Sequence, residues 1–236
     1  MKKFYILIAV TVLAIALVIG LWMLTNARSF QTFGRLVNRV ETPRKIVALT
    51  FDDGPTTEVT RPLLDLLEKE QVRATFFVTG AELEKQMTLG IRIVAMGHEL
   101  GNHSYSHTRM FFVTPSFVQN EIERTDALIR EAGYQDTIHF RPPFGKKLFV
   151  LPYYLSQTGR TTVTWDVEPD SDARATAGEI AQRAVQNTRP GSIILLHVMY
   201  PNRVESLKAV GTIINELKER GYEFVTVSEL LAEQPN

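Results

Sequence analysis

The chain has 236 residues, of which 44% are hydrophobic and 22% are charged, so it suits one globular domain of about 200 residues with a sizeable core. Lys plus Arg and Asp plus Glu both number 26, which gives a formal net charge of zero. There is no basic excess of the kind that nucleic-acid binding requires. Cysteine is absent, so any metal must be held by histidine and carboxylate groups.

The first 25 residues predict a membrane anchor. The 21 residues of Phe4–Leu24 carry no charge, and as a helix they span about 30 Å, the thickness of a bilayer's hydrocarbon core. A lysine pair precedes this segment, and aromatic residues lie near both of its ends. We therefore expect residues 1–25 to be an uncleaved transmembrane signal-anchor, with the rest of the chain extracytoplasmic. The alternative is a signal peptide cleaved at Thr25-Asn26-Ala27 and a secreted protein.

The remainder divides into a linker, one domain and a short tail. Residues 26–44 are polar, basic and weakly patterned, and predict a linker. Residues 45–231 predict the catalytic domain, and 232–236 a tail. The strand candidates are Ile46–Thr50, Ala74–Val78, Glu99–Gly101, Ile138–Phe140, Thr161–Trp165, Ile193–His197 and Phe224–Val227. Helical periodicity covers Arg61–Glu70, Glu82–Met96, Ser116–Ala132, Ala177–Asn187 and Ser206–Arg220.

Alternating strands and helices predict an α/β fold made of parallel βαβ units. We expect a small, distorted (β/α) barrel of about seven parallel strands, with a doubly wound open sheet as the alternative. In both, functional groups lie at the carboxyl ends of the strands. Polar residues follow five of the strand candidates: Asp52-Asp53, His103, Arg141, Asp166 and His197.

The pair Asp52-Asp53 and the histidines His103 and His107 predict a divalent-metal site. Neighbouring side chains at the end of a strand point to opposite sides, so one carboxylate can bind metal while the other faces substrate. Two histidines four residues apart can grip one ion if their segment makes a helical turn. Neutral imidazoles with a carboxylate suit Zn²⁺. Hydrolysis by a metal-activated water is the resulting hypothesis.

Four motifs together resemble a known family. Thr50–Pro55, His103–His107, Arg141–Gly145 and Leu195–His197 occur in the order of the motifs of NodB-like polysaccharide deacetylases, the fourth carbohydrate esterase family. The resemblance covers about Lys45–Leu230. It implies a distorted (β/α) barrel, a divalent metal that is commonly zinc, and hydrolysis of N-acetyl groups on amino sugars.

The resemblance also implies roles for individual residues. Asp53, His103 and His107 would be the metal ligands. Asp52 would be the general base, oriented by Arg141. A nearby guanidinium keeps such a base ionised until it accepts a proton, which agrees with this assignment.

Further roles follow from the later motifs. His197 would be the general acid, and Leu195 would line the pocket for the acetyl methyl group. Among the aromatic residues, Phe144 and Tyr105 are expected near the substrate. The family's remaining motif usually contains an Asp-Trp pair, which the stretch Trp165–Ala173 lacks. The carboxylate partner of the acid histidine is therefore left open among the three aspartates of that stretch, Asp166, Asp170 and Asp172, of which we prefer Asp172.

The sequence thus predicts a membrane-anchored, Zn²⁺-dependent N-deacetylase of an extracytoplasmic glycan, either peptidoglycan or an N-acetylglucosamine polymer. We expect a monomer whose partners are the glycan and the membrane, and no nucleic acid. The same chemistry could serve another acyl group or non-peptide C–N bond. A non-catalytic glycan-binding or scaffolding protein on the same fold is the alternative of a different class. The intact set of acidic and histidine residues argues against it.

Overall fold

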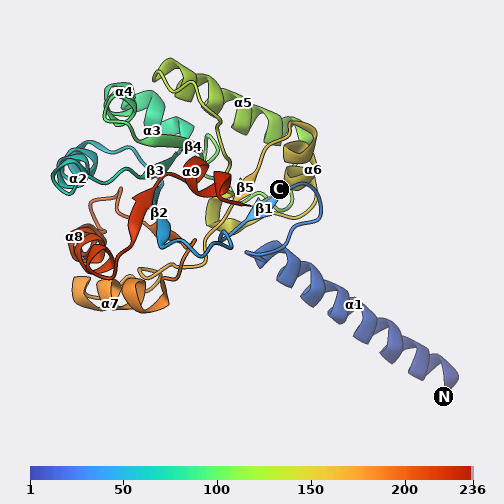
Figure 1. Cartoon of the computed structure of the whole chain (residues 1–236). Helices are drawn as coiled ribbons and strands as arrows, with labels where there is room; N and C mark the ends of the chain where they lie inside the picture. Colours follow the sequence, from blue (N-terminus) through green and yellow to red (C-terminus); the bar gives the residue numbers. More distant parts are fainter. Residues whose placement is uncertain (235–236) are drawn as a thin grey trace.

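The computed structural model describes residues 1–234 (Figure 1). Its strands are β1 Leu36–Val37, β2 Ile46–Asp52, β3 Thr75–Val78, β4 Glu99–Asn102, β5 Thr162–Val163, β6 Ile193–Leu196 and β7 Glu223–Val225. Its helices are α1 Lys2–Asn26, α2 Thr57–Lys69, α3 Gly80–Lys85, α4 Met87–Ala95, α5 Pro115–Glu131, α6 Val150–Gln157, α7 Ala177–Asn187, α8 Val204–Glu219 and α9 Val227–Ala232, with a 3₁₀ turn at Pro143–Gly145.

The strands form a distorted parallel barrel around β2. Strand β2 pairs in parallel with β3, β6 and β7, β3 pairs with β4, and β1 pairs with β5. Single bridges complete the ring: Phe140 joins β4 to β5, and Val167 joins the segment after β5 to β6. Helices α2 to α8 surround the strands (Figure 1). The prediction of a distorted (β/α) barrel is confirmed.

Burial of apolar residues explains why these segments adopt these structures. All seven residues of β2 are buried, as expected for a strand of a parallel sheet that is covered on both faces. Helix α2 turns its leucines Leu63, Leu64 and Leu67 inward and its charged residues outward. Helix α7 begins with a capping box, in which the side chains of Thr176 and Glu179 each accept from the other's backbone N–H.

The predicted helix over Glu82–Met96 is instead two helices, α3 and α4. They are separated by Gln86, whose backbone is not helical. The break lets the two helices fold against each other at close range, because a Cβ atom on Gly90 would lie 2.3 Å from Cδ1 of Leu83. Apolar periodicity runs across both helices and so concealed the break.

Residues 26–44, which the sequence predicted to be a linker, pack against the domain. Val37 and Val40 are buried, and Leu36–Val37 forms β1 against β5. The backbone N–H of Val40 donates to the carbonyl of Gly191 at 2.9 Å. Gly191 has a φ of +79°, and a Cβ atom there would lie 1.8 Å from the Val40 carbonyl oxygen, so only glycine fits. This segment is part of the barrel wall between β5 and β6.

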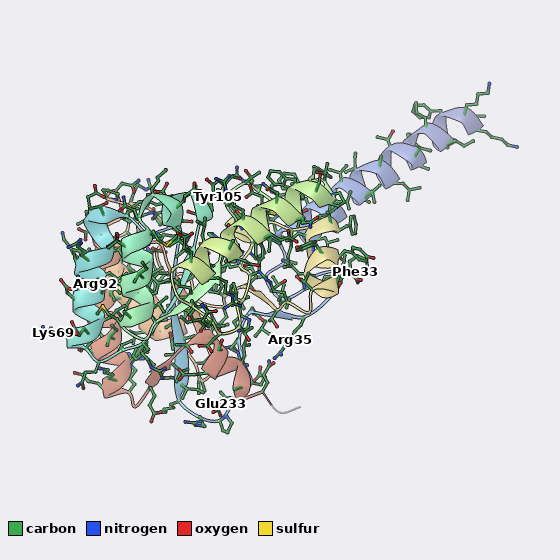
Figure 2. The ribbon with its side chains drawn as sticks, turned by 90° about the horizontal axis from the view of Figure 1, so that it is seen from above. Phe33, Arg35, Lys69, Arg92, Tyr105 and Glu233 are labelled. Atoms are coloured by element: carbon green, nitrogen blue, oxygen red, sulfur yellow. The ribbon has the colours of Figure 1, made fainter. Side chains whose placement is uncertain are left out.

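Helix α1 stands apart from the barrel (Figures 1 and 2). It spans 25 residues with a mean hydropathy of 2.9 in its most apolar window, and nearly all of it is exposed. Its length and composition therefore allow it to cross a membrane. A signal sequence would have the same length and composition. Its carboxyl-terminal end contacts the domain, where Thr25 is buried.

Candidate metal centre and active site

A cavity of about 310 Å³ opens at the carboxyl ends of β2, β4 and β6. This is the edge of a parallel barrel where functional groups gather, because the loops after the strands converge there. The residues that line the cavity are Arg28, Asp52, Asp53, His103, His107, Phe144, Trp165, Glu168, Ser171, His197 and Arg203.

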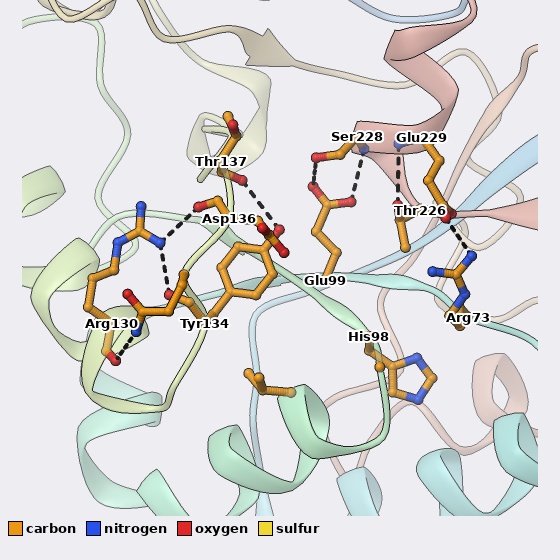
Figure 3. Close-up of a pocket in the computed structure, with 13 residues that line it drawn as sticks. Arg73, His98, Glu99, Arg130, Tyr134, Asp136, Thr137, Thr226, Ser228 and Glu229 are labelled. Carbon is orange, nitrogen blue, oxygen red and sulfur yellow. Dashed lines mark hydrogen bonds and ion pairs between the residues drawn. The ribbon is translucent and has the colours of Figure 1, made fainter.

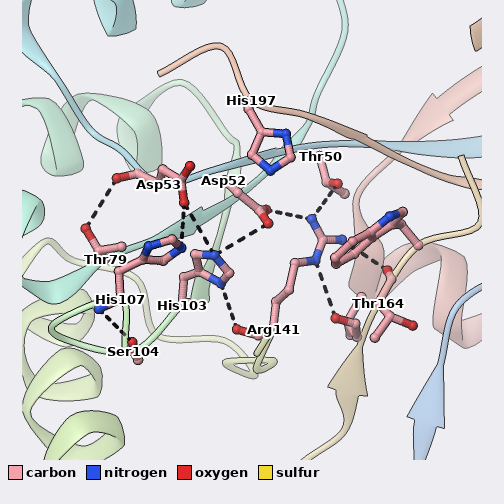
Figure 4. Close-up of polar contacts among 12 residues, drawn as sticks. Thr50, Asp52, Asp53, Thr79, His103, Ser104, His107, Arg141, Thr164 and His197 are labelled. Carbon is pink, nitrogen blue, oxygen red and sulfur yellow. Dashed lines mark hydrogen bonds and ion pairs between the residues drawn. The ribbon is translucent and has the colours of Figure 1, made fainter. Parts of the chain in front are cut away.

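Asp53, His103 and His107 converge on one point of this cavity (Figure 4). Their ligand atoms all lie within 4.8 Å of one another. The Oδ1 atom of Asp53 is 3.0 Å from Nε2 of His107 and 3.5 Å from Nε2 of His103. This buried oxygen has no hydrogen bond of good geometry with the described residues, which a bound cation would remedy. The donor set, one carboxylate and two imidazoles, fits a divalent transition metal.

The charge of Asp53 is retained despite its burial. Burial by itself would raise the pKa of this carboxyl, but the interactions with His103 and His107 outweigh it and hold the pKa well below its usual range. Asp53 is therefore an ionised ligand candidate at neutral pH.

The two histidines lie on a loop, not on the helical turn that their spacing suggested. Asn102 Oδ1 accepts from the backbone N–H of Ser104 at 2.8 Å, and Ser104 Oγ accepts from that of His107 at 3.1 Å. The carboxylate of Glu121 accepts from the backbone of the same loop. Side chains therefore impose the loop shape that a helix would otherwise have supplied.

Backbone strain concentrates around the cavity. Among the described residues, five that are not glycine have a positive φ, and four of them lie here: Asp53, Ser104, His107 and Phe144. Residues with side chains adopt this conformation rarely, and it persists where the surrounding structure enforces it. The cluster of strained residues is an independent sign that the loops are shaped for function.

A hydrogen bond fixes the proton position of His103. Its Nδ1 donates to the carbonyl of Arg141 at 2.7 Å, because a carbonyl can only accept. In the neutral imidazole this leaves the lone pair on Nε2, which faces Asp53, as metal ligation requires.

Asp52 is held by the buried guanidinium of Arg141. Nη1 of Arg141 donates to Asp52 Oδ1 at 2.6 Å and to Thr50 Oγ1 at 2.8 Å, and Nη2 donates to the carbonyl of Thr164 at 3.2 Å. Arg141 is completely buried; burial lowers the pKa of its guanidinium, and the Asp52 carboxylate opposes this effect. The other oxygen of Asp52 lies 3.6 Å from Nε2 of His103, so Asp52 sits beside the candidate metal position.

The structure pairs His197 with Asp170, and the preference for Asp172 is therefore wrong. Asp170 Oδ1 lies 3.3 Å from Nδ1 of His197, and Asp170 Oδ2 accepts from the His197 backbone and from Ser206 Oγ, both at 2.8 Å. Asp172 is solvent-exposed and bonds instead to Arg174. Burial alone would lower the pKa of His197, but the hydrogen bond and charge of Asp170 raise it to about 9.

A shift of the alkaline limb of the pH–rate profile is expected for Asp170→Asn. If protonated His197 is the acid, activity is present below its pKa and is lost as the pH rises through it. Without the Asp170 charge the pKa falls from about 9 to its ordinary 6.5 or lower, so the protonated fraction at pH 8 drops roughly thirtyfold. Acetate release measured from pH 6 to 10 checks this. Asp172→Asn is the matched control, and an unchanged limb in Asp170→Asn would contradict the pairing.

Three further predicted residues have different outcomes. Phe144 lines the cavity, with its ring 4.6 Å from that of His107. Tyr105 does not line it, because its hydroxyl donates to Glu84 at 2.6 Å on the outer surface. Leu195 is fully buried in the core and does not line it either. The predictions for Tyr105 and Leu195 as substrate contacts are therefore not supported.

Several cavity residues were not predicted from the sequence. Arg28 and Glu168 form an ion pair of 2.5 Å, and Glu168 also accepts from the indole N–H of Trp165 at 3.0 Å. Arg203 donates to the carbonyl of Asp170 at 3.2 Å. Among these residues, only Trp165 had a sequence feature that could have indicated the cavity, because it lies at the end of a predicted strand. Arg28 lies in the segment that was predicted to be a linker.

A larger cavity, of about 700 Å³, lies at the amino ends of β3 and β4 (Figure 3). Its buried Glu99 accepts hydrogen bonds from Thr75 and from the backbone and hydroxyl of Ser228. Burial also lowers the pKa of His98 to about 4, so this histidine is neutral at pH 7. This cavity lies at the end of the barrel opposite the carboxylate–histidine cluster.

Fold and site together define an α/β barrel with a candidate metal centre at its carboxyl edge. The family model described as polysaccharide deacetylase matches residues 39–163, more than half of the chain. The chain therefore belongs to the polysaccharide deacetylase family.

Individual relatives support this assignment. The peptidoglycan-N-acetylglucosamine deacetylase PgdA of Listeria monocytogenes serotype 1/2a is 34% identical over 80% of this chain, and the chain spans 40% of that protein's length. The solved structure of the peptidoglycan N-acetylglucosamine deacetylase Bc1960 has a TM-score of 0.78 and 33% identity, and covers 83% of this chain and 92% of its own. A mutant of BA3943, a CE4 family pseudoenzyme with restored activity, also has a TM-score of 0.78, with 29% identity over 87% of this chain and 74% of its own. Because the fold also occurs in a pseudoenzyme, activity must be argued from the site.

Proposed function

We propose that this protein is a membrane-anchored, Zn²⁺-dependent N-deacetylase that removes acetyl groups from amino sugars of an extracytoplasmic glycan. The observation that carries the proposal is the convergence of Asp53, His103 and His107 within 4.8 Å, with Asp52 beside them. The named activities of the relatives point to peptidoglycan as the glycan. The exposed apolar helix α1 supports the anchor.

The residues can be given roles in amide hydrolysis. Asp53, His103 and His107 would hold the cation, which when bound would acidify water and polarise the amide oxygen. Asp52 accepts the proton of the attacking water, whose oxygen bonds to the acetyl carbon. Arg141 fixes the direction of the Asp52 carboxylate through the 2.6 Å hydrogen bond.

Cleavage of the C–N bond requires a proton for the departing amine. His197 lies in the cavity and carries a proton at neutral pH, because Asp170 raises the pKa of its imidazole to about 9. It donates that proton to the amine nitrogen, and the products are acetate and a free amino sugar. The Asp170 carboxylate bound to Nδ1 leaves Nε2 as the donor atom.

Metal removal tests the proposal. The full-length protein, purified in detergent and loaded with Zn²⁺, should release acetate and free amine in equal amounts from peptidoglycan fragments or N-acetylglucosamine oligomers. Treatment with a chelator should reduce the rate to background, and Zn²⁺ should restore it.

The same assay separates the alternatives. Acetate without free amine from O-acetylated sugars would indicate an esterase. Equal rates with and without metal would exclude the proposed mechanism. Tight glycan binding without release of acetate from any substrate would favour the scaffolding protein.

A further inference from the structure

The end of helix α1 and one wall of the candidate active site are the same short segment. Helix α1 ends at Asn26, and Arg28, only two residues later, lines the cavity together with Asp52 and His197. Two residues extend the chain by at most about 7 Å. No flexible stalk separates the apolar helix from the cavity.

Every residue of this junction contacts the domain. The Thr25 carbonyl accepts from the backbone N–H of Lys147 at 3.4 Å, and the Ala27 carbonyl accepts from the ammonium of the same lysine. The Asn26 side chain accepts from Lys146. Both lysines directly follow the Pro143–Gly145 turn that carries Phe144 into the cavity. The junction is therefore tied to an active-site loop.

Arg28 extends this connection toward the candidate base. Its guanidinium pairs with Glu168 at 2.5 Å and lies 4.8 Å from the ring centre of Trp165. Its carbonyl accepts from Thr164 Oγ1 at 2.6 Å, and the Thr164 carbonyl accepts from Arg141. The orientation of α1 is thus fixed relative to the reacting groups.

The surroundings of the junction suit the headgroup layer of a bilayer. Trp22 lies under the Lys146 ammonium at 4.7 Å, and both residue types are favoured at the membrane interface. Arg109 lies over Phe144 at 4.1 Å and has no ion pair within the described part of the chain. Cations in this position attract phosphate groups at a lipid surface. In Figure 2, α1 leaves from the edge along which Tyr105 lies, away from Glu233 at the opposite edge.

We infer that the active site is held at the bilayer surface and that its substrate is a glycan still attached to a lipid in that membrane. The inference rests on the proposed function. If α1 spans the hydrocarbon core, Arg28 falls within the headgroup layer, which is roughly 5–8 Å thick on each side. A glycan fixed to the same leaflet lies within reach of the cavity, whereas a distant polymer does not.

Activity of the full-length, Zn²⁺-loaded protein in nanodiscs tests this. The probe is an N-acetylglucosamine tetramer coupled to a phospholipid headgroup, compared with the free tetramer at the same bulk concentration. The attached tetramer should react roughly tenfold faster or more, because both reactants share one surface. Inserting about 28 residues of polar helix between Leu24 and Thr25 lifts the site by roughly 40 Å and should remove this advantage while the rate on free tetramer stays. The control carries the same insertion before Lys2.

A distance measurement tests the geometry without activity. Because the chain has no cysteine, one dye can be placed at Ser171→Cys beside the cavity or at Lys69→Cys, which lies at the edge far from α1 in Figure 2. Energy transfer to acceptors on the lipid headgroups should be stronger from position 171.

The outcomes separate the two proposals. The membrane inference alone would be overturned by equal rates on free and attached tetramer, by an advantage that persists in the variant with the insertion after Leu24, or by equal energy transfer from both positions. A mature chain that begins at or after Ala27 would overturn the membrane anchor in both proposals and would leave only the proposed deacetylase activity. No acetate from either tetramer or from peptidoglycan would overturn the proposed function as well.

Discussion

Asp52→Asn is expected to reduce the turnover number for acetate release by about 10²–10⁴-fold, the usual contribution of a general base. The amide keeps the size of the side chain and can still contact Arg141, but it cannot accept the proton of the attacking water. Zn²⁺ content and glycan affinity should remain close to those of the parent protein, because Asp53, His103 and His107 are untouched. Metal analysis and steady-state kinetics measure the two effects separately.

Asp166→Asn is the matched control for this variant. Asp166 also follows a strand, but its carboxylate accepts from Ser192 Oγ and from the backbone of Ile193, both at 2.9 Å, and it does not line the cavity. Its replacement should leave the turnover number nearly unchanged. If Asp52→Asn turned over at the parental rate with metal bound, Asp52 could not be the base.

Arg141→Met is expected to lower the free energy of unfolding by about 3–5 kcal/mol, the usual cost of removing one partner from a buried ion pair. Both side chains are almost fully inaccessible, with exposed fractions of 0% for Arg141 and 2% for Asp52. The variant leaves the Asp52 carboxylate buried without its main counter-charge, and Thr50 and Thr164 lose a donor. Urea unfolding of the full-length protein, followed by tryptophan fluorescence, measures the change.

A double variant tests the physical reason. Combining Arg141→Met with Asp52→Asn also removes the buried carboxylate charge that the single variant leaves without a partner. The double variant should therefore be more stable than the sum of the two single effects predicts, by about 0.5–3 kcal/mol. Arg92→Met is the surface control, because Arg92 pairs with Asp65 at 3.0 Å in solvent, and it should cost less than about 1 kcal/mol. Strict additivity of the two buried changes would show that the destabilisation arises from lost packing.

The metal centre could be predicted because parallel strands bring their carboxyl ends to one edge. Asp53 follows β2 and His103 follows β4, so the order of elements alone places them together. The partner of His197 could not be predicted in this way. Asp166, Asp170 and Asp172 lie on one loop, and only the backbone path and a hydroxyl from the start of α8 single out Asp170.

Other parts of the site were hidden for different reasons. Tyr105 follows His103 by two residues and still points outward, because the loop turns through a residue with positive φ at Ser104. Leu195 lies on a predicted strand, but the face it occupies belongs to the core. Arg28 was missed because a polar, basic composition is typical of linkers, and neither composition nor periodicity shows that a two-residue strand docks the segment.

The place of β1 has a practical consequence for where a stable fragment can begin. A truncation that starts at Lys45 would take away the piece of chain that fills the gap between β5 and β6. Val163 and Trp165, which pack beside Val37 and Val40, would then face water. The folded unit therefore begins earlier in the chain than the stretch that carries the family's motifs. An alignment that starts at the first motif would leave out β1 and its contacts with β5.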